Sequence, residues 1–101
     1  MDIETRTEEL RAWLAQRWPQ QQFTVVPRGR QVVIAWVAPE FPGDPARLIR
    51  LSYQPSGHWD VSYFRHTGRW EVLPTLGGPW PAIRQVLADD PLGLFWADLK
   101  A

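Results

Sequence analysis

The sequence contains no cysteine, and lysine supplies only one of its 11 basic residues. The absence of cysteine excludes disulfide bonds, cysteine-ligated zinc, iron–sulfur clusters and thiol catalysis, so packing must stabilise the fold. No stretch approaches the roughly 18 consecutive apolar residues of a membrane-spanning helix. Residues 1–6 also lack the basic start and apolar run of a secretory signal. We therefore expect a cytoplasmic protein without a membrane partner.

The chain is too short to hold two independent hydrophobic cores. Each half of its 101 residues would fall to a length that rarely folds without disulfides or metals. Apolar residues make up 45% of the chain and charged residues 22%, which is typical of globular proteins. We predict one folded domain over residues 1–101, and we expect most of its seven tryptophans to lie in the core.

Apolar periodicity predicts a helix near the amino terminus. Thr5 and Glu8 have the S/T-x-x-E spacing of a capping box, and Pro19 ends the pattern. Between them, apolar residues recur at helical spacing and form one stripe, namely Leu10, Trp13, Leu14 and Trp18. This stripe predicts an amphipathic helix that faces the core.

Two β-rich segments follow and predict a hairpin. Residues 23–26 and 31–38 carry β-branched and aromatic side chains on either side of a short turn that contains Gly29. Residues 32–37 are apolar on both alternations, which is typical of a strand covered on both faces. We therefore expect this strand to be the middle of the sheet.

Three further segments predict a meander after the proline-rich loop at residues 39–45. Residues 47–54, 59–65 and 70–73 alternate between apolar and polar positions and are separated by short turns. Strict alternation puts Arg47 on the same side as Ile49 and Leu51, and Arg50 on the opposite side. The order of the strands stays open at this point.

A second helix is expected after the Gly77-Gly78 break. Prolines at 79 and 81 suit a first helical turn, an apolar stripe follows at 83, 86 and 87, and Pro91 ends the helix. Residues 92–96 are too apolar for a free end and should pack back onto the domain. The fold class predicted is α+β: an N-terminal helix, a four- to five-stranded antiparallel meander sheet and a C-terminal helix packed on the sheet.

From Arg50 onward the features follow a recurrent order: aromatic rings at alternate strand positions, a charged turn, a helix that ends at aspartate, and a Phe-Trp pair. The residues concerned are Trp59, Tyr63, Phe64, Arg65, Arg69, Trp70, Asp90, Phe95 and Trp96. Over this second half the sequence resembles a bacterial family of short proteins known as a domain of unknown function and ending in Phe-Trp. The resemblance supports the fold and implies no activity and no functional residues.

Catalytic patterns are weak in this sequence. His58, Asp60 and Ser62 stand at alternate positions, but a triad needs histidine between the other two, and neighbours along one strand face lie roughly 6.5 Å apart. We interpret this segment as a solvated strand face. His58 and His66 bracket a strand and are too far apart to share a metal ion. We predict no enzyme activity, no catalytic residue, no metal and no cofactor.

Arginines accompany aromatic rings in the middle of the chain. Net charge is zero overall, but residues 28–69 sum to +3, against −1 before them and −2 after them. The candidate contact residues are Arg28, Arg30, Arg50, Arg65, His66 and Arg69. Arginine and tryptophan are enriched at the centres of protein interfaces, so we predict a non-enzymatic interaction domain that binds a protein partner or self-associates.

The alternative is a small DNA- or RNA-binding protein. Arginines bind phosphates and rings stack on unpaired bases, so the same residues would suit a single strand. The neutral net charge argues against this alternative, since nucleic-acid binders usually carry a basic excess. Whether the arginines share one face depends on the strand order.

Overall fold

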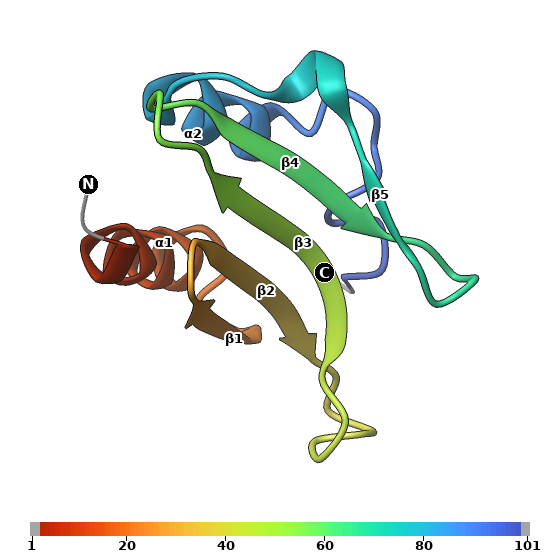
Figure 1. Ribbon diagram of the computed structural model, residues 1–101. Helices are drawn as coiled ribbons and strands as arrows, with labels where there is room; N and C mark the ends of the chain where they lie inside the picture. Colours follow the sequence, from red (N-terminus) through yellow and green to blue (C-terminus); the bar gives the residue numbers. More distant parts are fainter. Residues whose placement is uncertain (1–2, 100–101) are drawn as a thin grey trace.

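Five antiparallel strands form one sheet in the computed structural model, which describes residues 3–99 (Figure 1). The elements are helix α1 (Ile3–Arg17), strands β1 (Gln22–Arg28), β2 (Gln31–Val37), β3 (Ala46–Tyr53), β4 (Trp59–Phe64) and β5 (Trp70–Val72), the 3-10 helix η1 (Pro74–Leu76) and helix α2 (Trp80–Asp89). The strands lie in the order β1-β2-β3-β4-β5. The predicted α+β fold with a meander sheet is therefore confirmed. No helix within residues 3–99 is long and apolar enough to span a membrane.

Helix α1 contributes the predicted apolar stripe. Leu10 and Leu14 are buried, and Trp13 and Trp18 pack against the core. The capping-box prediction is wrong, because Thr5 lies inside the helix and not at its start. Ile3 packs against the core, so burial of this side chain favours helix upstream of Thr5.

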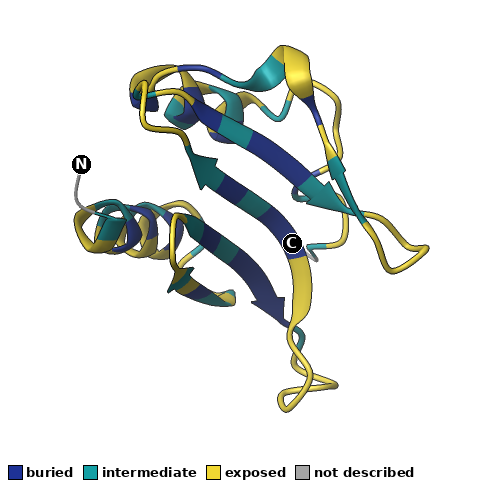
Figure 2. Ribbon diagram, viewed as in Figure 1, coloured by how far each residue is buried: buried dark blue, intermediate teal, exposed yellow. Residues whose placement is uncertain are grey.

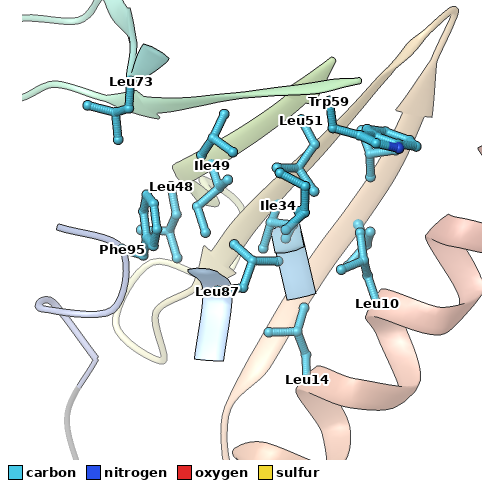
Figure 3. Close-up of a cluster of buried hydrophobic side chains, with 14 of the residues drawn as sticks. Leu10, Leu14, Ile34, Leu48, Ile49, Leu51, Trp59, Leu73, Leu87 and Phe95 are labelled. Atoms are coloured by element: carbon cyan, nitrogen blue, oxygen red, sulfur yellow. The ribbon is translucent and has the colours of Figure 1, made fainter. Parts of the chain in front are cut away.

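Both helices lie on the same face of the sheet. The register pairs Val25 with Ile34 and Ile34 with Ile49, so these side chains share a face. Figure 3 shows Leu10 and Leu14 of α1 and Leu87 of α2 in one cluster with Ile34, Ile49, Leu51 and Trp59 of the strands. Buried residues concentrate in β2, β3 and β4 (Figure 2). Three tryptophans are buried, three others pack against the cluster, and only Trp70 lies elsewhere. The expectation that most tryptophans are core is confirmed.

The segment after α2 packs back onto the domain, as predicted. Asp90 adopts a left-handed φ of 44°, and its carboxylate accepts hydrogen bonds from the backbone N–H groups of Leu94 (2.9 Å) and Phe95 (3.1 Å). Phe95 is buried, and the Trp96 indole donates to the carbonyl of Leu87 at 2.8 Å. The tail thereby closes the core between the helices.

Strand β2 is not the middle of the sheet, contrary to the prediction. The central strand is β3, because three strands follow the 39–45 loop and two precede it. On the helix side Val32 and Ile34 are fully buried. On the other side Val33 is half-buried while Ala35 and Val37 are buried, so the strand is partly covered on both faces, as expected. A strand such as β2, with apolar residues at both odd and even positions, therefore does not need a helix on each face of the sheet.

A β-bulge changes the orientation of one arginine. Ile34 pairs with Ile49, but Ala35 pairs with Arg47, so Leu48 is the extra residue in β3. Arg47 consequently points to the helix-free face, together with Arg50, and Leu48 joins the buried core. The strict alternation predicted for Arg47 is wrong for this reason.

Glu9 connects the two helices. Its carboxylate accepts hydrogen bonds from Arg6 (3.1 Å), from the Trp80 indole N–H (2.9 Å) and from Arg84. Burial raises the pKa of Glu9, but the hydrogen bonds from Trp80, Arg6 and Arg84 outweigh this effect and hold the pKa below its ordinary value of 4.5. The ionised carboxylate therefore stabilises the contact between α1 and α2.

We predict that Glu9→Gln lowers the free energy of unfolding at neutral pH. The loss should be under about 1 kcal/mol, since the side chain is partly exposed. The native pKa lies below that of the unfolded chain, so this stabilisation is present above pH 4.5 and disappears as the pH falls through the native pKa. Urea denaturation across this range should show the variant and wild type converging in acid. A difference that does not depend on pH would contradict this role, and Glu8→Gln, at the exposed pair with Arg11, is the control.

Gly77 lies against the start of β4. Gly78 forms a bridge with Trp59 through two backbone hydrogen bonds of 2.8 and 3.0 Å, which ties the chain before α2 to the sheet. A Cβ atom on Gly77 would lie 2.7 Å from Nε2 of His58 and 2.9 Å from the carbonyl oxygen of Trp59. The close approach therefore requires glycine at this position.

We predict that Gly77→Ala lowers the free energy of unfolding by about 1–3 kcal/mol, because the added methyl group overpacks against backbone. Gly43→Ala is the matched control, since no atom lies within 4 Å of the position of its Cβ. Thermal or urea denaturation of both variants measures the difference. Equal stabilities of the two variants would contradict this, because they would show that the backbone around Gly77 can move to accommodate a methyl group.

Candidate functional site

The face of the sheet opposite the helices carries arginines and rings. We call the surface formed by Arg28, Arg47, Arg50, Phe64 and Trp70 the arginine–aromatic face. The register runs from Val26 through Val33, Arg50 and Ser62 to Val72, so these side chains share the helix-free side. Val26 and Val72 are 47% and 49% exposed, which shows that this side is open to solvent.

Four of these side chains form a continuous row of contacts. The guanidinium carbon of Arg47 lies 5.3 Å from the Phe64 ring centroid, and that of Arg50 lies 5.0 Å from the Trp70 ring centroid. The two rings are 5.0 Å apart with an interplanar angle of 69°. Each guanidinium therefore gains a cation–π contact, worth about 0.5–1 kcal/mol at an exposed site. Arg47, Phe64, Trp70 and Arg50, in that order, are named the ladder below.

A shallow groove runs along the same face. It has a volume of about 420 Å³ and is lined by Val26, Arg28, Gln31, Val33, Arg47, Arg50 and Trp70. Two valines thus form part of its wall, and three arginines line it as well. The groove can hold an extended, narrow ligand that carries negative charge.

Negative charge is scarce on this side of the sheet. Arg28, Arg47 and Arg50 form no ion pair with any described residue. Asp60 is the one carboxylate on the helix-free side of the described strands, and it already contacts His58 (3.2 Å) and Gln54 (2.7 Å). The groove is therefore electropositive although the chain as a whole is neutral.

The six predicted contact residues do not form one patch. Arg28 and Arg50 line the groove, while Arg30 lies in the turn between β1 and β2. Residues 65–69 form the turn between β4 and β5 at the opposite end of the sheet (Figure 1). The six therefore divide among the groove and the two ends of the sheet.

The β4–β5 turn has its own contacts. Arg65 pairs there with Glu71 at 2.7 Å, while His66 and Arg69 are exposed. Sequence reasoning missed Arg47, because the bulge that brings it beside Phe64 leaves no signal in the alternation pattern. Phe64 was not chosen as a contact residue, although it pairs with Trp70 in a regular register.

A second, wider hollow of about 920 Å³ lies beside this turn. Basic Arg47, Arg65 and His66 line it together with acidic Glu40, Asp44 and Asp98. Its charge is mixed, so it lacks the electropositive character of the groove. Arg47 lies between the two and contributes to both.

The structure brings His58 and Asp60 together but does not complete a catalytic group. Nε2 of His58 lies 3.2 Å from Asp60, so these two side chains approach each other more closely than the spacing along a strand face implies. Ser62 is only 2% exposed, so the interpretation of a solvated strand face is wrong at this residue. Arg50 and Trp70 meet across β4 and cover it. Among residues 3–99, no three side chains of ligand type gather closely enough to hold a metal ion.

We predict that Trp70→Ala costs little stability. Trp70 is half-buried on the short edge strand β5 and lies outside the core cluster, so its removal loses one ring pair and one cation–π contact, about 1–2 kcal/mol together. Trp59→Ala, at a fully buried ring, should cost about 3–5 kcal/mol. Urea denaturation measures the free energy of unfolding of both variants. Equal decreases would contradict this prediction and mean that Trp70 contributes to the stability of the fold as much as Trp59 does.

Comparison with known proteins places the chain in a family. No curated protein matches the chain, and no solved structure matches it. The family model described as "Domain of unknown function (DUF3024)" matches residues 2–97. The match thus extends well beyond the second half, where the resemblance was noted, and confirms the prediction of a domain of unknown function. The chain belongs to the DUF3024 family.

Proposed function

We propose that this protein is a non-enzymatic interaction domain that binds an extended polyanionic partner across the arginine–aromatic face. The ladder of Arg47, Phe64, Trp70 and Arg50 is the observation that carries the proposal. Its guanidinium groups lack carboxylate partners among the described residues, and they lie on the side of the sheet that no helix covers.

Stacking prepares these arginines for anions. An arginine side chain has many rotamers, and ordering it on binding costs about 0.5–1.5 kcal/mol. Contacts with Phe64 and Trp70 fix Arg47 and Arg50 beforehand, so less of this cost remains. Nε of Arg50 is buried without a hydrogen-bond partner in the described part of the chain, so this cation is already partly desolvated. Partial desolvation strengthens its attraction to an anion.

A second copy of the chain fits this face poorly. Two such faces would oppose arginines to arginines, and like charges placed opposite each other are destabilising. A protein partner with an acidic segment or a nucleic acid supplies the complementary charge. The cytoplasmic location, the bacterial origin and the Phe-Trp ending of the family remain predictions from the sequence.

The proposal is tested by titrating the isotope-labelled protein with inorganic polyphosphate at low salt and following it by NMR. We predict that the indole N–H signal of Trp70 and the Nε–H signals of Arg47 and Arg50 shift together. The double variant Arg47→Gln/Arg50→Gln should bind at least about tenfold more weakly, because one hydrogen bond to a charged group contributes about 1.5–3 kcal/mol.

Arg30→Gln/Arg69→Gln is the matched control. It removes the same charge from two turns that lie at opposite ends of the sheet. This control should bind like wild type. Shifts confined to the turns, an equal loss in both double variants, or no shift at all would contradict the proposal.

A further inference from the structure

We infer that the polyanion is a single-stranded nucleic acid, an inference that rests on the proposed function. Its phosphates contact the arginines, and its bases stack on the rings of the same face. Single strands are commonly bound in positively charged grooves where aromatic side chains stack on successive bases. The groove here meets both conditions, since Arg28, Arg47 and Arg50 line it together with Trp70.

The spacing of the arginines suits a chain of phosphates. Arg47 and Arg50 lie on one strand, about 7–10 Å apart at a rise of 3.3 Å per residue with one residue in a bulge. Arg28 lies two strands from Arg50, about 10 Å across the sheet at 4.8 Å per strand. A flexible single strand can follow this path, because its backbone is not fixed by a partner strand.

The rings of the face provide stacking surfaces. Phe64 and Trp70 are half-buried, meet at 69° and each carry a guanidinium group over the ring, so a base can stack on the part of each ring that is still exposed. Every base has a π-face, and the guanidinium planes of Arg47 and Arg50 can also stack on bases. The exposed Val26 and Val72 extend the apolar surface on either side.

The neutral net charge makes stacking necessary. A domain with a formal charge of zero gains little long-range attraction for a polyanion, and three arginines give few phosphate contacts. Stacking adds about 1–3 kcal/mol per base. An acidic peptide supplies negative charge but has no bases to stack on the rings, so its binding free energy lacks the contribution of stacking.

A double helix fits the site less well than a single strand. A helix can enter the DNA major groove, but both helices of this domain lie on the other side of the sheet. The bases of a duplex are also stacked on one another and unavailable to Trp70. We therefore expect a preference for unpaired bases.

The experiment compares four labelled probes by fluorescence anisotropy at several salt concentrations. They are a deoxythymidine oligomer of about ten nucleotides, the same length of abasic oligomer, a duplex, and poly-aspartate of equal charge. The deoxythymidine oligomer should bind wild type at least about tenfold more tightly than the abasic oligomer, because only the bases differ. It should also bind more tightly than the duplex and poly-aspartate.

Two variants separate charge from stacking. Trp70→Ala should weaken binding of the deoxythymidine oligomer about tenfold, leave the salt dependence unchanged and reduce its advantage over the abasic oligomer. Arg47→Gln/Arg50→Gln should reduce the slope of log K against log salt by about 0.7 for each lost phosphate contact. Arg30→Gln/Arg69→Gln should change neither quantity.

The outcomes distinguish this inference from the function on which it rests. Equal binding of the deoxythymidine oligomer, the abasic oligomer and poly-aspartate would overturn the nucleic-acid partner and leave a general polyanion-binding face. A tighter complex with the duplex would likewise overturn it. Binding of no probe would overturn both proposals. The comparison of probes needs only the wild-type protein, so it stands even if a variant does not fold.

Discussion

One-sided burial of the sheet is the constraint on which the rest of the structure depends. Both helices and the segment up to Trp96 pack on one face, where a continuous cluster joins α1, the strands and α2. Glu9 holds the two helices together by accepting hydrogen bonds from Trp80 and Arg84. Because all the helical cover lies on this side, the other face is only partly covered: Ser62 is buried there, but Arg47, Val26 and Val72 are exposed.

The open face is organised by a single backbone irregularity. One extra residue in β3, Leu48, points inward and moves Arg47 to the outer face, so a small change in register both fills the core and completes the ladder. Ser62, the small residue on β4 between Arg50 and Trp70, leaves room for these two side chains to meet across the strand. The bulge in β3 therefore affects both faces of the sheet: Leu48 packs in the core, and Arg47 adds positive charge to the opposite face.

The sequence predicted the elements better than their assembly. The stripe containing Leu10 and Leu14, the turns and the proline-bounded second helix are local patterns, and local patterns can be read from neighbouring residues. The central place of β3 and the orientation of Arg47 depend on long-range pairing, which alternation does not encode. Arg28 and Arg50 were identified as candidates, but their separation from Arg65 follows from the up-and-down order of the strands, and Arg47 was hidden by the bulge.

The central claim is that the helix-free face presents a fixed arrangement of guanidinium groups and rings. Nuclear Overhauser effects measured on the isotope-labelled protein test it most directly. The account predicts contacts from the side-chain methylenes of Arg47 to the Phe64 ring and from those of Arg50 to the Trp70 indole, with Leu48 in contact with the core. Contacts of Arg47 with core residues such as Leu87, with Leu48 on the outer face, would contradict it.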